Sequence, residues 1–516
     1  MYWNLFRMLG GLASENAAKF LALTLQSISE SDYNVSGLLP LLPVYWLLGS
    51  GRVVYVAAIC ALYVVPAALT AAYLALHGRP ASGPVWLAVI SALLMPVFWN
   101  AALRGMIDPI GLIPLGLAAS LLWNTRFLTQ ASRTASLRLG ILLWLPFLFR
   151  RWYAYSIVAL IGLSLIAAAF LIWRECRTSA PSRKWDPVLR ALPRWAVLAI
   201  VLILGLVLYQ LPLVYRIVNT DYGTVYAAYQ TSRWQQAVSY WQNFGPVIAA
   251  FLLLGAGVDI HRRNWKTLFF LTVALLIGLS FARQGFAPGV QHYLPIALMI
   301  FPVCYSGICF AWQGLSLPWR LAVPLVLVLN FANTYVPPST GSVQTVREAF
   351  GGPAYPPLRL DRYADYVKLT DDLLALGDNA RIAVFASSLN LSGSLLTAVN
   401  PSLRPRMIAV GEVDLRDRFP WEALDTDYVV IGHPTQIHLD PAGQRVISIP
   451  AEEIAGGTGI GASFESTGHR YDLANGVSGE VYHRFRPIPA ADLAAFKEQF
   501  YRIYPQWRAD DGTAAP

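Results

Sequence analysis

Residues 152–173 read WYAYSIVALIGLSLIAAAFLIW and contain no charged side chain. A helix that crosses a bilayer needs about 20 mostly apolar residues, so this stretch predicts a transmembrane helix. The rest of the chain has the same character, since 56% of its 516 residues are hydrophobic and only 13% are charged. Soluble domains carry about 25% charged residues. We therefore predict a membrane protein with many spans.

Ten segments are apolar enough to be candidate spans of an all-α polytopic bundle. They are 53–76, 84–99, 109–123, 136–149, 152–173, 195–213, 244–260, 266–282, 290–312 and 319–335. A further apolar run at 38–49 is too short to span and contains Pro40 and Pro43. We interpret it as a helix that lies on the membrane surface or re-enters the membrane.

Three basic loops predict the orientation of the spans, because cytoplasmic loops of membrane proteins are rich in Lys and Arg. They are 124–138, 174–194 and 261–266. All three fall on one side of this arrangement, which leaves both ends of the chain on the opposite, periplasm-like face. No span precedes residue 52, so we expect a first helix upstream of Met1. The basic residues behind the net charge of +9 are scattered among the spans and do not predict nucleic-acid binding.

The composition changes near residue 336, where Pro, Gly and charged residues become frequent and predict a linker. After it, RIAVFAS (381–387) and DYVVIG (427–432) resemble buried strands, and 363–377 resembles an amphipathic helix. We therefore predict three parts. They are an outer-face loop with amphipathic surface helices at 1–52, a transmembrane domain at 53–335 and a small periplasmic α/β domain at 336–516.

Acids, arginines and aromatic residues gather in the outer loops. They are Glu30, Asp32, Tyr33 and Asn34, then Arg104 and Asp108, then Arg150 and Arg151, then Arg216, Asp221 and Trp234, and last Arg283, His292 and Tyr293. A carboxylate can take a proton from a hydroxyl group, and arginines can hold a phosphate with paired hydrogen bonds. Aromatic rings suit the apolar faces of sugars. Such a site at a membrane face fits a lipid-phosphate substrate.

Each of these residues also has a structural interpretation. The aromatic residues could form an interfacial belt, and the arginine pair at 150–151 could contact lipid headgroups. His292 could be a hydrogen-bonded structural histidine. Asp108, which precedes Pro109, could be a helix N-cap, and Asp32 could belong to a turn before the short helix.

Two patterns in the C-terminal part do not predict a known kind of site. The glycines of GGTGIG (456–461) have the wrong spacing for a dinucleotide fingerprint, so we predict a loop. His433 and His438 have no further ligands beside them, so we predict no metal site there.

The layout of the chain resembles the GT-C superfamily of polytopic glycosyltransferases, which includes lipid A aminoarabinose transferases, protein O-mannosyltransferases and arabinofuranosyltransferases. SESDYN followed by SGLLPLLPVYWLLG is similar to the acidic first outer loop and surface helix of that group. RGMIDPIG is similar to a second acidic loop, and RQGFAPGVQHYLPIALMIFP to a late loop near the carrier phosphate. The resemblance implies an inverting transferase of a bacterial inner membrane that takes a sugar from polyprenyl phosphate.

The resemblance also implies roles for the loop residues. Asp32 would be the general base, with Asp108 as its partner or as a group that positions the acceptor. The donor phosphate would be bound by Arg283, His292, Tyr293, Arg216 and Arg151. The sugar or acceptor would be bound by Glu30, Tyr33, Asn34, Arg104, Asp221 and Trp234. The acceptor would be a glycan, lipid or protein hydroxyl, and a divalent metal (Mg or Mn) is the only cofactor considered.

Two other classes are compatible with the sequence. An O-antigen polymerase or ligase also uses arginines in outer loops, but it usually carries a large loop between late spans. A transporter or flippase predicts ionisable residues inside the spans and an inverted repeat. The sequence shows almost no such residues in its spans and no evident repeat.

Overall fold

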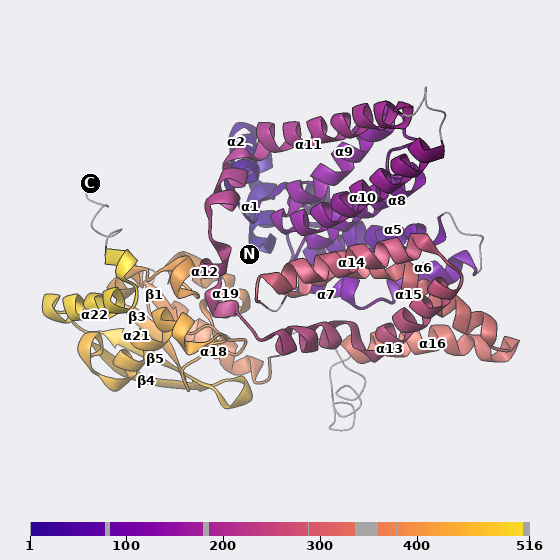
Figure 1. Cartoon of the computed structure of the whole chain (residues 1–516). Helices are drawn as coiled ribbons and strands as arrows, with labels where there is room; N and C mark the ends of the chain where they lie inside the picture. The colour runs from indigo at the N-terminus through magenta and orange to yellow at the C-terminus, as the bar shows by residue number, and fades with distance from the viewer. Residues whose placement is uncertain are drawn as a thin grey trace. The chain divides into compact units, whose positions relative to one another are not determined.

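The computed structural model describes residues 2–77, 83–178, 185–286, 288–335, 360–377 and 379–508. The chain divides into two compact units (Figure 1). The first comprises Met1–Thr220 and Thr231–Pro357, and the second comprises Asp221–Gln230 and Leu358–Pro516. The short segment Asp221–Gln230, which the sequence assigns to the membrane part, therefore packs with the C-terminal unit. The linker predicted from residue 336 lies almost wholly outside the described residues.

Seven helical stretches of the described chain are long and apolar enough to cross a membrane. They are Arg52–Leu76 (α4, η2 and α5), Arg151–Thr178 (η4 and α10), Asp186–Asn219 (α11), Arg233–His261 (α13), Trp265–Arg283 (α14), Val290–Gly314 (η7 and α15) and Leu317–Tyr335 (η8 and α16). A bent pair, α6 (Val85–Leu93) and α7 (Val97–Leu103), makes an eighth if it counts as one span. The chain is thus a multi-pass helical membrane protein.

The expectation of ten spans was too high. The stretches 109–123 and 136–149 form α8 (Leu112–Asn124) and α9 (Arg133–Phe149), of 13 and 17 residues. The turn η3 (Asp108–Gly111) directly precedes α8. The basic loop 124–138 lies between these two shorter helices, so it no longer bears on orientation. The loops at 174–194 and 261–266 still fall on one common side.

The N-terminal residues are helical. Helix α1 (Tyr2–Glu15) is followed by α2 (Ala17–Glu30), whose N-terminus is capped by the side chain of Asn16. The apolar run predicted to be too short to span is indeed short, since it forms η1 (Ser36–Leu41) and α3 (Leu42–Leu48). Gly49 ends it with a positive φ of 88°.

Helix α15 (Leu294–Gly314) lies at the centre of the first unit. In the span that contains it, 89% of the most apolar window is buried, against 44% or less in the other six. Its closest neighbour is α13, because two glycines let the backbones meet. A Cβ at Gly255 would lie 1.9 Å from the carbonyl oxygen of Val303, and one at Gly307 would lie 2.2 Å from that of Phe251.

We expect Gly255→Val to destabilise the protein severely, by more than about 3 kcal/mol, because its Cβ would strike backbone atoms that cannot move aside. Gly257→Val on the same helix is the matched control, since a Cβ there meets nothing within 4 Å. Thermal unfolding of both variants in detergent measures the difference. Equal melting temperatures would contradict the close helix crossing.

The C-terminal unit contains a five-stranded sheet of order β2-β1-β3-β5-β4 (Figure 1). The strands are β1 (Ile382–Phe385), β2 (Met407–Ile408), β3 (Tyr428–His433), β4 (Phe464–Asp472) and β5 (Ser478–Arg484). Strand β1 pairs in parallel with β2 and β3, whereas β5 runs antiparallel to both β3 and β4. The two strands predicted from the sequence are β1 and β3, so this prediction is confirmed.

Helices cover both faces of the sheet, so the unit has three layers. Ile382, Val384 and Val430 pack on the side of α18 (Tyr363–Ala375) and α19 (Gly393–Val399). The alternate residues of the same strands pack on the side of α21 (Arg445–Gly456) and α22 (Ala490–Ile503). Shorter helical turns complete the unit. They are α12 (Tyr222–Val225), η6 (Ala227–Tyr229), η9 (Pro401–Arg406), α20 (Asp414–Asp417), η10 (Trp421–Asp425), η11 (Pro441–Gly443), η12 (Gly459–Ser463) and η13 (Ala474–Gly476).

The glycine-rich stretch GGTGIG forms the turn that the sequence predicts. Helix α21 ends at Gly456, and Gly457 and Gly459 then take positive φ angles of 62° and 52°. A residue with a side chain rarely adopts such angles. The backbone conformation of the turn therefore explains why glycine stands at these positions, and no dinucleotide site is needed to explain it.

Candidate functional site

Asp108 is the buried centre of a polar cluster in the first unit. One carboxylate oxygen, Oδ1, accepts hydrogen bonds from Arg150 Nε at 2.8 Å and from Trp152 Nε1 at 2.9 Å. The Tyr153 hydroxyl donates to the backbone oxygen of Asp108 at 2.7 Å. The other oxygen, Oδ2, is buried and has no hydrogen-bond partner among the described residues. The carboxylate makes no N-cap bond, so the structure contradicts that interpretation.

Arg150 joins Asp108 to the N-terminal segment. Its guanidinium group lies 5.1 Å from the ring centre of Tyr2 and 4.8 Å from that of Tyr33, and it also donates to the Tyr2 hydroxyl. Only 3% of Arg150 is exposed, so the interpretation as a lipid-headgroup contact is wrong for this residue. Two aromatic rings and one carboxylate thus enclose the cation.

Asp32 lies between two arginines. Its Oδ1 is 2.6 Å from Arg216 Nη2, and its Oδ2 is 3.2 Å from Arg151 Nη1. The carboxylate side chain is 23% exposed, so a small molecule can reach it, unlike Asp108. The structure therefore brings both predicted acids into one network, because Arg150 and Arg151 are neighbours in the chain and bind one acid each.

The helix α11 carries Arg216 to this place. The backbone of α11 departs from helical geometry at Gln210, two residues before Pro212. The side chain of Gln210 accepts a hydrogen bond from Trp144 Nε1 at 3.2 Å, which ties the kink to α9. The last turn of α11, beyond the kink, holds Arg216.

Asn34 holds the turn that carries Asp32. It is 1% exposed, and its amide donates to the carbonyl of Leu148 at 2.8 Å. Its Oδ1 accepts from the backbone N–H and the hydroxyl of Ser36, at 3.1 and 2.5 Å. Asn34 is therefore built into the fold and not directed at a ligand. Glu30 is exposed and accepts from Gln26 at 3.2 Å.

His292 borders the cluster on the side of Trp152. The edge of its ring approaches that of Trp152 with centres 5.2 Å apart, and it stacks on Phe281 at 4.8 Å. Its Nδ1 accepts from the N–H of Gly289 at 3.0 Å, so the ring is also part of its own turn. The neighbouring Tyr293 faces away, since its hydroxyl is 2.6 Å from that of Ser239 on α13.

The remaining predicted residues lie outside this cluster. Arg283 and Trp234 are exposed near the ends of α14 and α13, and no hydrogen bond to the cluster is described for either. Arg104 is half-buried and ends α7. Asp221 packs with the C-terminal unit, where its carboxylate caps α12. The hydrogen bond from the Thr224 hydroxyl is the main reason that the pKa of Asp221 is lowered.

Three residues of the cluster were missed by the sequence analysis: Tyr2, Trp152 and Tyr153. All three contact Asp108 or its partner Arg150. Trp152 and Tyr153 are marked in the sequence only as an aromatic pair directly after two arginines, which an interfacial belt explains equally well, and Tyr2 has no such signal.

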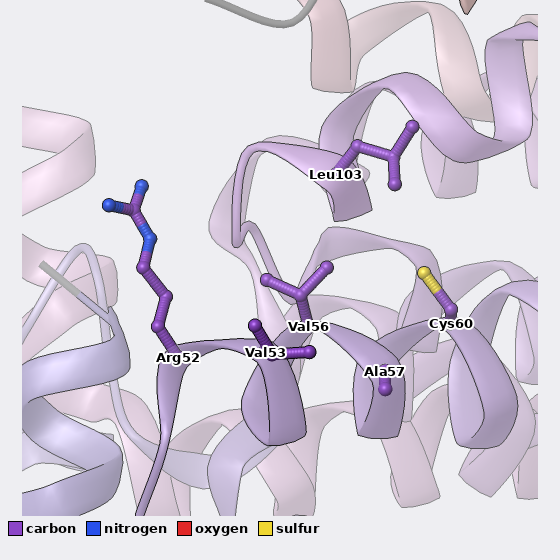
Figure 2. Close-up of a pocket in the computed structure, with 6 residues that line it drawn as sticks. All are labelled: Arg52, Val53, Val56, Ala57, Cys60 and Leu103. Atoms are coloured by element: carbon purple, nitrogen blue, oxygen red, sulfur yellow. The ribbon is translucent and has the colours of Figure 1, made fainter. Parts of the chain in front are cut away.

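An apolar groove lies along the helix that begins at Arg52 (Figure 2). It has a volume of about 450 Å³, and its lining residues are Arg52, Val53, Val56, Ala57, Cys60 and Leu103. Arg52 is the single charged group and extends at one end, away from Cys60. The same helix, α4 (Arg52–Ile59), carries Tyr55, whose hydroxyl donates to the Gly105 carbonyl at 2.9 Å, three residues before Asp108. Helix α4 therefore lines the groove and also contacts the loop that leads to Asp108.

Within the described residues, no group of three or more His, Cys, Asp or Glu side chains could hold a metal ion. No protein-family model and no curated protein matches this chain. The fold defines a multi-pass helical membrane protein with a C-terminal α/β unit, and the cluster around Asp32 and Asp108 is its candidate site.

We expect Arg150→Gln to lower the free energy of unfolding by about 3–5 kcal/mol, because it leaves the buried Asp108 carboxylate without a cation. The matched control is Arg190→Gln, which removes an exposed pair with Glu175 and should change stability by less than about 1 kcal/mol. Thermal unfolding in detergent measures both. A similar small effect of the two substitutions would contradict the importance of the buried pair.

Proposed function

We propose that this protein is an inverting membrane glycosyltransferase that moves a sugar from a polyprenyl phosphate to an acceptor hydroxyl group. The observation that carries the proposal is the partly exposed Asp32 carboxylate between Arg216 and Arg151, at 2.6 and 3.2 Å. This reaction needs a base for the acceptor and positive charge for the departing phosphate. The Asp32 carboxylate is a possible base, and the two arginines paired with it supply the positive charge.

In the proposed reaction, Asp32 takes the proton of the acceptor hydroxyl while the acceptor oxygen bonds to the anomeric carbon of the sugar. The bond between that carbon and the phosphate oxygen breaks, and the polyprenyl phosphate leaves with the electron pair. Arg151 and Arg216 bind the phosphate as its charge grows. Binding of the donor phosphate would draw the two guanidinium groups from Asp32 and free its oxygens for the acceptor proton.

Asp108 has a different role in this proposal. Its Oδ1 is already bonded to Arg150 and Trp152, and the residue is fully buried. We assign it as a positioning residue that fixes Arg150, and through Arg150 the ring of Tyr33 next to Asp32. The resemblance implied instead that Asp108 is the partner of the base or positions the acceptor.

The groove in Figure 2 is the place proposed for the lipid tail of the donor. Its aliphatic lining suits an isoprenoid chain. The basic loops at 174–194 and 261–266 fall on one side of the spans, and their charge supports a cytoplasmic position for that side. The proposed site and the C-terminal unit follow the spans on the other side. We therefore assign the reaction and the C-terminal unit to the periplasmic face of a bacterial inner membrane.

The test uses the purified protein with a panel of labelled polyprenyl-phosphate sugars, with and without EDTA. We expect Asp32→Asn to lower the rate of transfer by at least about 100-fold, because the amide cannot accept the acceptor proton. Glu15→Gln, a change at an exposed acid at the end of α1, should leave the rate unchanged. Full activity of a folded Asp32→Asn variant would refute the assignment of the base.

We expect Ala57→Trp to fill the groove and to raise the KM for the polyprenyl donor by about ten-fold or more, equivalent to about 1.4 kcal/mol. The kcat should stay the same, because Ala57 does not touch Asp32 or its arginines. Leu69→Trp, at an exposed residue farther along the same helical stretch and outside the groove lining, is the control. A short-tailed donor should be used equally well by all three proteins, and an unchanged KM in Ala57→Trp would exclude the groove as the tail site.

A further inference from the structure

The strand order of the C-terminal unit makes a switch point at the carboxyl ends of the parallel strands β1 and β3. The chain passes from β1 to β2 on one side and then crosses to β3 on the other side of β1. The loops that follow β1 and β3 therefore leave the sheet in opposite directions. In open α/β sheets, such a switch in strand order at the carboxyl ends of the strands is where ligands bind.

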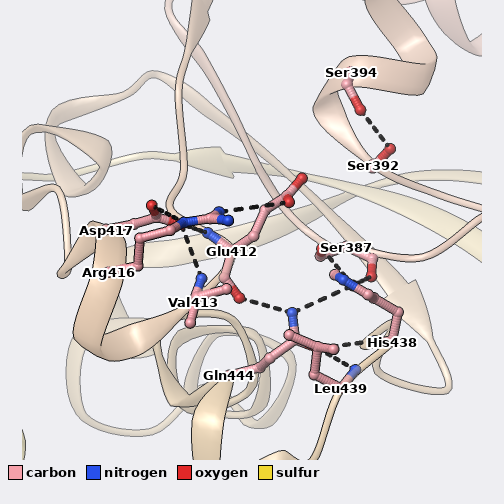
Figure 3. Close-up of polar contacts among 10 residues, drawn as sticks. All are labelled: Ser387, Ser392, Ser394, Glu412, Val413, Arg416, Asp417, His438, Leu439 and Gln444. Carbon is pink, nitrogen blue, oxygen red and sulfur yellow. Dashed lines mark hydrogen bonds and ion pairs between the residues drawn. The ribbon is translucent and has the colours of Figure 1, made fainter. Parts of the chain in front are cut away.

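Hydrogen bonds fix the loops at this switch point (Figure 3). The N–H of Ser387, after β1, donates to the carbonyl of Gln436, after β3, at 2.7 Å, and the Ser388 hydroxyl donates to the Gln436 side chain at 2.7 Å. Gln444 accepts from the N–H groups of His438 and Leu439 and donates to the carbonyl of Glu412, each at 2.8 Å. The loops after all three parallel strands are thus held in place before any ligand arrives.

His438 presents one ring nitrogen to the outside of this network. Its Nδ1 lies 2.6 Å from the carbonyl oxygen of Ser387, so Nδ1 carries the hydrogen and donates it. The Ser387 hydroxyl lies 2.9 Å from the same nitrogen and is therefore not activated as a nucleophile. The other nitrogen, Nε2, has no hydrogen-bond partner in the described part of the chain, and the ring is exposed. It is available to accept a hydrogen bond from a ligand.

A row of tyrosines lies beside His438. The rings of Tyr222 and Tyr226 stack with centres 6.1 Å apart, and those of Tyr226 and Tyr229 lie 5.8 Å apart. The ring of Tyr229 then approaches that of His438, at 6.5 Å. These tyrosines belong to the segment between α11 and α13, which packs on the C-terminal unit. This segment packs closely on the rest of the unit. A Cβ atom added to Gly443 would lie only 2.3 Å from the Cβ of Ala228 in the segment.

The charge at this edge does not favour an anion. Arg416, which lies 6.0 Å from the ring centre of Tyr226, is paired with Asp417 at 2.6 Å and with Glu412 at 3.9 Å. Burial alone would raise the pKa of Asp417, but the hydrogen bonds from Arg416 hold it below its usual value. One cation therefore faces two acidic side chains, and a ligand with a negative charge would be repelled.

We propose that the surface formed by the loops after β1 and β3, His438 and the tyrosine row is a binding site for a neutral saccharide. The C–H faces of a sugar ring are apolar and fit aromatic rings, whereas its hydroxyl groups fit His438, Arg416 and the acids beside them. This site is separate from the Asp32 cluster and does not depend on the function proposed for that cluster.

Calorimetry of the full-length protein in nanodiscs tests the site, with no donor present. The probes are hexasaccharides of glucose, mannose, galactose and arabinose, with a hexauronate as the anionic counterpart. We expect at least one neutral probe to bind with saturation and the hexauronate not to bind. Tyr229→Ala and His438→Ala should each weaken binding about ten-fold, and Tyr229→Trp should restore it.

Tyr363→Ala is the matched control, because Tyr363 is an exposed tyrosine on α18 of the same unit, and it should bind as the unchanged protein does. Asp32→Asn should also bind normally, which separates this site from the proposed transfer reaction. The proposal is overturned if no neutral probe binds, if only the hexauronate binds, or if Tyr229→Ala and His438→Ala leave binding unchanged.

Discussion

The ion pair between Asp108 and Arg150 is the interaction on which the rest of the membrane unit depends. Its two side chains are 0% and 4% exposed, so neither charge is compensated by water. Removing one partner of such a buried pair is far more damaging than removing an exposed pair. The rings of Tyr2 and Tyr33 close over the cation, which fixes the N-terminal segment to the end of α9.

The backbone at this point explains why two neighbouring arginines bind different acids. Arg150 is extended, with φ −154° and ψ 119°, and Arg151 begins the helical turn η4. Arg150, in this extended position, turns inward to Asp108, and Arg151, at the start of the helical turn, pairs with the more exposed Asp32. One acid is thereby sealed in the fold, and the other stays partly exposed.

The C-terminal unit is not built from one continuous piece of chain. Its sheet and helices come from the C-terminal residues, but the row of tyrosines comes from the segment that joins two candidate spans, α11 and α13. The Asp221 side chain caps the start of this segment, and Ser232 and Gln235 form a capping box at the start of α13. The segment Asp221–Gln230 therefore comes directly after the helix that carries Arg216. It also borders the proposed saccharide site.

The sequence by itself determined the membrane class, most of the spans and the strands β1 and β3, because apolar length and alternation are local properties of the chain. It also identified Asp32 and Asp108 as notable acids. Only the tertiary structure decided that Asp108 is sealed by Arg150, that two expected spans are short helices, and that Tyr229 packs with the C-terminal unit. The physical reason is that ion pairs and ring contacts join residues far apart in the chain, and packing alone selects the partners.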